Sequence, residues 1–151
     1  MFQGTIDQLV ILAVFLPVLA GQSGNTGCQA LAVTLRGITL GEIKAGNARL
    51  LIIKEGMLGA MNGAPVGIVT GLAMYVISSA QHSPHALALS MVVFLAMVGS
   101  CTISGISGAV VPLTLKRIGT DPATASSIFL TTATDVASMG MLLGLATVMI
   151  R

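Results

Sequence analysis

Charged residues are scarce in this chain, where they make up 8% of 151 residues, against about a quarter in an ordinary soluble domain. Tryptophan is absent and aromatic residues reach only 3%. The net charge of +2 comes with no basic run, so we expect no nucleic-acid partner. Cys28 and Cys101 stand alone, which indicates neither a disulfide framework nor a soft-metal site.

Long uncharged runs take the place of charge, and 54% of the residues are hydrophobic. The runs cover residues 8–35, 56–81, 85–115 and 122–150, the last broken only by Asp135. Each exceeds the roughly 20 residues that a helix needs to cross about 30 Å of hydrocarbon. We therefore predict an all-α fold, a polytopic bundle of four transmembrane helices in the lipid bilayer of the cell membrane. Residues 1–151 form one transmembrane domain in this interpretation.

The basic residues predict the orientation of the bundle, because cytoplasmic connections carry the positive excess. They fall in the connection after the first span and the connection after the third: Arg36, Lys44, Arg49, Lys54, Lys116 and Arg117. Both connections are expected to be cytoplasmic. The connection with His82 and His85 lacks Lys and Arg, so it is expected outside with both termini, and we expect a preceding span to carry the N-terminus across.

Glycine recurs every fourth residue in the second span, at Gly59, Gly63, Gly67 and Gly71. This spacing puts all four on one helix face, where another backbone can approach closely. Gly140 and Gly144 repeat the pattern in the last span, and the third span also contains several glycines. We expect these faces to pack the spans together, a role that by itself indicates no function.

Asp135 lies 14 positions after Asp121, or roughly 21 Å along a helix, near the middle of the membrane. A carboxylate there costs on the order of 3 kcal/mol, so it should face a cavity, an ion or a partner. One set of residues carries hydroxyl groups and shares the helix face of Asp135, and a second, apolar set is expected on the opposite face of the same helix. The first set is Thr124, Ser127, Thr131 and Ser138, and the second is Phe129, Leu130, Val136 and Leu143.

A structural alternative stays open for this stripe. Asp135 could be protonated and bonded to a neighbouring helix, with the threonine hydroxyls satisfying backbone carbonyls. The second span has a weaker counterpart, because Glu55, Gly59 and Asn62 share one face. We expect Glu55 at the cytoplasmic mouth, where this face is either a polar vestibule or a helix-end charge with an interhelical amide bond.

The stretch from Gly21 to Gly27 puts glycines and amides inside the first span. Irregular backbone at membrane depth is tolerated only when it is buried or lines water, so this stretch either breaks the helix beside a pore or merely loosens it. A break would expose carbonyl oxygens, including that of Gly21, next to the amide of Asn25. Magnesium is bound through one or two carboxylates plus neutral oxygens, which Asp135 and Asn25 supply.

Two sequence motifs resemble the MgtE family of magnesium channels and transporters. The first is P-x6-G-N-x-G-x-Q from Pro17 to Gln29, and the second is KRIGTDPATASSIFLTTATD from Lys116 to Asp135, with G-x-D-P-A and T-T-x-x-D. The resemblance implies a homodimer whose pore runs between the subunits. It implies that Asp135 binds hydrated Mg2+ at the centre, with Asn25, Ser127 and Thr131 beside it. Members usually carry five spans and often a cytosolic regulatory region.

The sequence therefore favours a transporter rather than an enzyme, with Mg2+ as the expected ion and Mn2+, Co2+ or Ca2+ as alternatives. A carrier in which Asp135 exchanges a proton or sodium for its substrate is a second hypothesis. A non-transporting membrane scaffold is a third, and the hydroxyl stripe around Asp135 argues against it.

Overall fold

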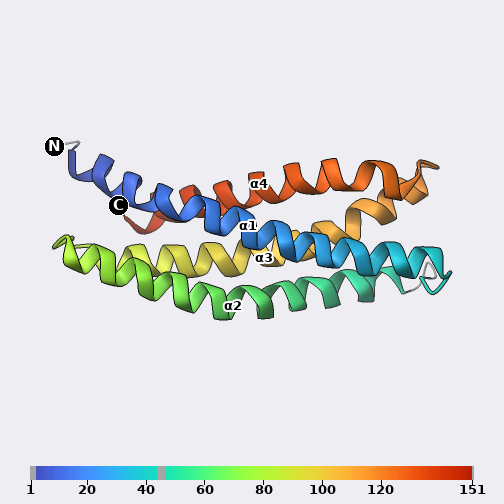
Figure 1. Cartoon of the computed structure of the whole chain (residues 1–151), viewed down its shortest axis with the longest axis horizontal. Helices are drawn as coiled ribbons and strands as arrows, with labels where there is room; N and C mark the ends of the chain where they lie inside the picture. The colour runs from blue at the N-terminus through green and yellow to red at the C-terminus, as the bar shows by residue number, and fades with distance from the viewer. Residues whose placement is uncertain (1–2, 44–46, 151) are drawn as a thin grey trace.

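The structure of the chain is a computed structural model that describes residues 3–43 and 47–150, with side chains described for 10–43, 47–123 and 126–150. Its helices are α1 (Gln3–Thr39), α2 (Ala48–Ala80), α3 (Ala86–Arg117) and α4 (Pro122–Met149). All four are long and apolar enough to cross a membrane. The prediction of an all-α bundle with four transmembrane helices is confirmed (Figure 1).

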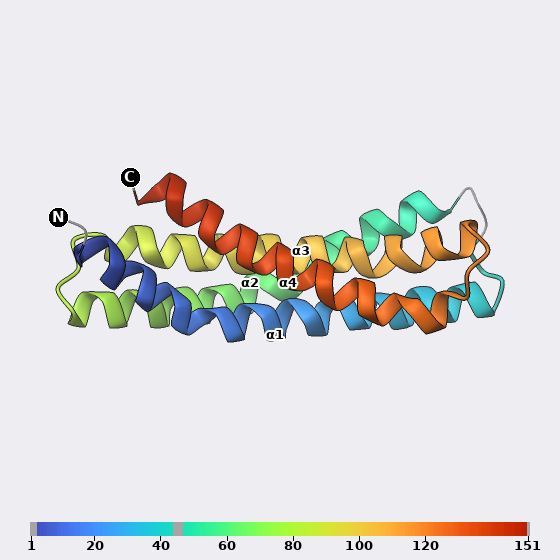
Figure 2. The ribbon, with the colours of Figure 1, turned by 90° about the horizontal axis from the view of Figure 1, so that it is seen from above.

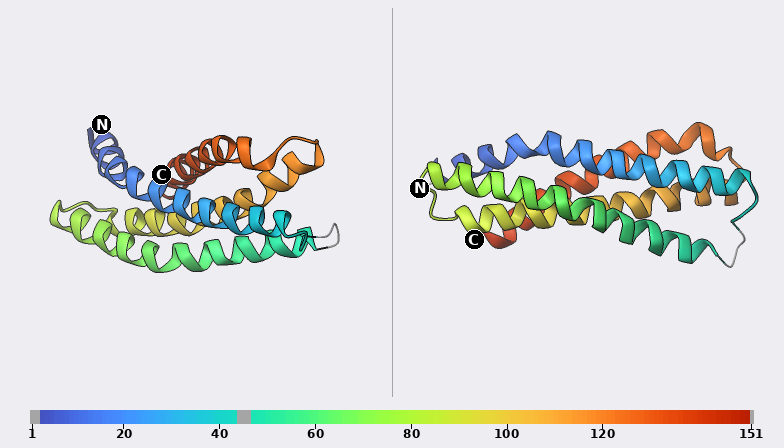
Figure 3. Two further views of the ribbon diagram at one scale, coloured as in Figure 1. Left: turned by 45° about the vertical axis from the view of Figure 1, so that its right-hand side comes forward. Right: turned by 60° about the horizontal axis from the view of Figure 1, so that its bottom comes forward.

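The helices run up and down along one axis, so that the two connections rich in basic residues lie at one end of the bundle (Figures 1 and 2). The start of α1 and the end of α4 lie at the other end, with the connection between α2 and α3. Helix α3 packs against all three other helices, whereas α1 and α2 touch only sparsely. Two further views show the same arrangement (Figure 3).

Small residues let α2 and α3 approach to backbone contact. A Cβ atom added at Gly59 would collide with the Cys101 carbonyl oxygen, and one at Gly63 would lie 3.0 Å from the Met97 carbonyl oxygen. The predicted glycine face of the second span is therefore a packing face, as expected for helices that associate in lipid. For the last span we expected Gly140 and Gly144 to pack against another span. Within a single chain this expectation is wrong, because a Cβ atom added at either glycine would meet open space.

The turn between α3 and α4 follows from the sequence G-T-D-P. Gly119 adopts a φ of +79°, and the N–H groups of Gly119 and Thr120 donate to the carbonyls of Lys116 and Leu115, an arrangement that ends α-helices. Asp121 then caps α4 by accepting a hydrogen bond from the Ala123 N–H. These bonds fix where α4 starts and thus the register of Asp135.

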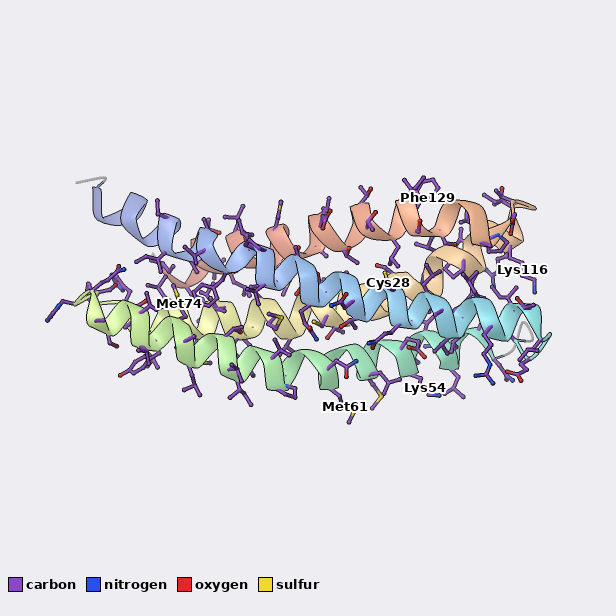
Figure 4. The ribbon with its side chains drawn as sticks, in the orientation of Figure 1. Cys28, Lys54, Met61, Met74, Lys116 and Phe129 are labelled. Atoms are coloured by element: carbon purple, nitrogen blue, oxygen red, sulfur yellow. The ribbon has the colours of Figure 1, made fainter. Side chains whose placement is uncertain are left out.

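The hydrophobic core lies in the half of the bundle nearest the chain ends. It contains residues from all four helices, including Leu12, Leu19, Met74, Val93 and Leu142; Met74 is labelled in Figure 4. Beyond this core, toward the basic connections, the interior is lined by glycines and small polar residues. The candidate site begins there.

Candidate functional site

Backbone contacts place one residue of each helix in a common layer across the bundle. A Cβ at Gly27 of α1 would lie 3.1 Å from Cγ2 of Thr134 in α4 and 3.4 Å from the Ser104 carbonyl oxygen in α3. A Cβ at Gly105 of α3 would collide with the Glu55 carbonyl oxygen of α2. Gly27, Glu55, Gly105 and Thr134 therefore lie at about the same depth.

This layer is well inside the bundle. Gly105 precedes Arg117, the last residue of α3, by twelve positions, or about 18 Å of helix. Asp135 follows Thr134 directly, so its carboxylate belongs to this layer too. Glu55 also belongs to it, seven residues after Ala48, where α2 starts, or about 10 Å of helix. Helix α2 therefore starts nearer to this layer than α3 ends, and the expectation that Glu55 lies at the cytoplasmic mouth stays a prediction.

Asp135 is exposed on the outer surface of the single chain, while its neighbour Thr134 is buried. Ser127 and Thr131 are exposed on the same flank of α4. Within the described residues the Asp135 side chain has no hydrogen bond or ion pair. Three members of the predicted stripe, Ser127, Thr131 and Asp135, thus face out of the chain on one flank of α4, whereas Ser138 is buried.

The hydroxyl groups of the stripe bond their own helix. Thr131 Oγ1 donates to the Ser127 carbonyl at 3.1 Å, and the buried Ser138 Oγ donates to the Asp135 carbonyl at 3.0 Å. This part of the structural alternative is observed. Each hydroxyl oxygen still has lone pairs, so an exposed Thr131 or Ser127 can accept a hydrogen bond from an ion's water. Nothing is described of the Thr124 side chain.

The positions expected to be apolar and opposite the stripe divide into two groups. Leu130 is 1% exposed and packs inside the chain, against Gly27. Phe129, Val136 and Leu143 are at least half exposed, and Phe129 points away from the bundle (Figure 4). Helix α4 therefore shows a polar flank and an apolar flank on the surface of one chain.

Helix α1 continues without interruption through Gly21 to Gly27, so the alternative of a broken helix is wrong. The hydroxyls of Ser23 and Thr26 donate to the carbonyls of Ala20 and Gln22 at 3.1 and 3.0 Å. Gly21 is exposed, and a Cβ there would have open space around it. The glycine at 21 is thus not needed for packing within the chain.

Asn25 lies on another flank of α1 from Gly27, because residues two apart on a helix point about 200° apart. It lines a cavity of about 650 Å³ between α1 and α2, together with Gln22, Gln29 and Asn62. A single chain does not bring Asn25 next to Asp135. The glutamines were missed as candidates, although their spacing with Asn25, at steps of three and four, could have identified them.

Comparison of the chain with known proteins identifies its family. A family model described as a divalent cation transporter, MgtE, matches residues 16–145. The chain belongs to the MgtE family. It is 32% identical over 150 residues to a magnesium transporter MgtE of Enterococcus faecalis and equally to one of Bacillus subtilis. It is 27% identical over 152 residues to the magnesium transporter MgtE of Thermus thermophilus.

Each of these alignments covers 99% of this chain but 32% of the relative, so the chain spans about a third of the length of the curated relatives it matches. The region that matches the MgtE model includes every candidate residue on α1 and α4. The bundle described above is thus a polytopic membrane bundle of the MgtE family, which is a family of transporters and not of enzymes.

Proposed function

We propose that this chain moves Mg2+ across the cell membrane through a pore formed between two copies, with the two Asp135 side chains holding the hydrated ion. The observation that carries the proposal is the exposure of Asp135 at mid-bundle depth, on a flank that also presents Ser127 and Thr131. The three relatives named as magnesium transporters support Mg2+ as the ion.

Burial of this flank by a second copy follows from the energetics of the bilayer. A carboxylate that faced lipid would cost on the order of 3 kcal/mol, and within the described residues no base pairs with it. A two-fold axis beside α4 would remove Asp135 from lipid and bring two carboxylates toward one position. Two such charges repel in a medium of low dielectric unless a divalent cation lies between them.

Mg2+ gives up its waters reluctantly, so the proposed site holds the ion through its hydration shell. The carboxylates of Asp135 accept hydrogen bonds from the waters, and the hydroxyl oxygens of Ser127 and Thr131 do the same along the flank. Asn25 and Gly21 are both exposed on α1, and in this proposal they take part from α1 of the second copy: the amide as a further acceptor and the glycine by leaving room for water.

The test is Mg2+ uptake into liposomes that contain the purified protein and a magnesium-sensitive dye. We expect uptake above that of protein-free liposomes, with a rate that is unchanged when sodium is replaced by choline or when the proton gradient is collapsed. Uptake that needs sodium or a proton gradient would instead identify a coupled carrier. Absence of uptake by correctly folded protein would leave only the scaffold hypothesis.

A further inference from the structure

A second polar cavity lies between α1 and α2, on the other side of the bundle from α4. It measures about 260 Å³ and shares Thr26, Gln29 and Asn62 with the larger cavity that Asn25 lines. Its lining adds one acid, Glu55, from α2. The rest of the lining is apolar: Ala30, Val33, Leu58 and Gly59.

Glu55 is 5% exposed, and within the described residues its carboxylate has no hydrogen bond and no ion pair. Its neighbour Lys54 is near enough for a Coulombic interaction with this carboxylate, but the ammonium group is exposed and does not line the cavity. The carboxylate lies in the same layer as Asp135, because the Glu55 backbone touches Gly105. A buried acid at this depth without a protein partner requires a counter-charge or a proton.

The polar side chains that line the cavity beside Glu55 all carry oxygen atoms of the kind that hard cations prefer. Asn62 and Gln29 offer amide oxygens. The hydroxyl of Thr26 donates to the Gln22 carbonyl at 3.0 Å and also contacts the Cys101 thiol, so one of its two lone pairs is available as an acceptor. The cavity lining contains no His or Cys, which argues against a soft metal. The volume has room for several waters, so a cation can keep part of its hydration shell.

We infer that Glu55, with Asn62, Gln29 and Thr26, forms a second binding site for a partly hydrated divalent cation. The site belongs to α1 and α2 of one chain, whereas the proposed Asp135 site lies on α4 and needs two chains. It therefore does not rest on the role of Asp135.

Mn2+ titration followed by electron paramagnetic resonance tests the inference, with Asp135→Asn protein as the background so that the α4 site is removed. We expect this protein to bind one Mn2+ per chain, with Mg2+ competing. Adding Glu55→Gln, which keeps size and removes the charge, should abolish the binding. Glu42→Gln removes the same charge from an exposed connection and should leave the titration unchanged.

Gln29→Met is a second variant, chosen because Gln29 is exposed and its replacement should fold. It removes one oxygen donor and should weaken Mn2+ binding about tenfold. The inference is overturned if the Asp135→Asn protein binds no Mn2+, or if Glu55→Gln and Gln29→Met both bind it as the background does. Binding of Na+ with no competition from Mg2+ would also overturn it. None of these outcomes depends on whether Asp135 carries flux.

Discussion

Gly27 of α1 lies directly against Thr134 of α4, where an added Cβ would be 3.1 Å from the threonine methyl. This contact sets the height of α4 beside α1 and so the depth of Asp135. It also explains why Asp135 is exposed: Thr134 turns into the chain, and the next residue on the helix turns out of it.

Replacing Gly27 should therefore disturb the packing of α1 on α4. Gly27→Leu puts a branched side chain against Thr134 and Leu130, and overpacking of this kind costs about 1–3 kcal/mol. We expect a lower midpoint of thermal unfolding in detergent. Gly24→Leu is the matched control, because a Cβ there meets nothing within 4 Å. Equal destabilisation by both variants would argue against the contact.

The orientation of the bundle remains a prediction. Because the basic connections share one end, a cysteine in place of Arg49 should be inaccessible to an impermeant thiol reagent on intact cells. A cysteine in place of His82, at the other end, should react. Both are made in a Cys28→Ser, Cys101→Ser background. Reaction at position 49 but not at 82 would reverse the assignment.

The proposed pore requires two copies. Mass measurement in detergent, corrected for bound detergent, should give twice the chain mass of 15.3 kDa. The physical reason is that only a second copy removes the polar flank of α4 from lipid while bringing two acids together. A monomer that retains full Mg2+ uptake would contradict the dimer.

Much of the fold could be predicted from the sequence, because the uncharged runs and the every-fourth-residue glycines report directly on membrane spans and their close packing. The relative height of the helices could not be predicted. Glu55 is only seven residues from the start of α2, yet its backbone lies against Gly105, which is twelve residues from the end of α3. No local pattern contains that offset.

The candidate site shows the same limit. The steps of three and four correctly predicted that Ser127, Thr131 and Asp135 share a flank of α4. They did not predict that this flank lies outside the chain, because periodicity gives a direction around one helix and says nothing of which neighbour fills it. For Asn25, motif resemblance suggested a place beside Asp135, whereas the register of α1 points it toward α2.

The hydroxyls of Thr131 and Thr132 offer a matched pair for testing the flank. Both are exposed, and both donate to the Ile128 carbonyl, at 3.1 and 3.0 Å, but only Thr131 belongs to the stripe. Thr131→Val should slow Mg2+ uptake several-fold, because an acceptor for the ion's waters is lost. Thr132→Val should not. If the two variants behave alike, the stripe does not line the path of the ion.

Mg2+ uptake by Asp135→Asn protein in liposomes tests the central claim most directly. This change keeps the size of the side chain and removes both charges from the proposed dimer, so uptake should fall to the level of protein-free liposomes. Asp135→Glu should keep part of the rate, and Glu42→Gln, which removes an acid from an exposed connection, should keep all of it. Gel filtration must show the same elution volume for every variant. Uptake by Asp135→Asn at the wild-type rate would contradict the account and leave Asp135 a structural residue.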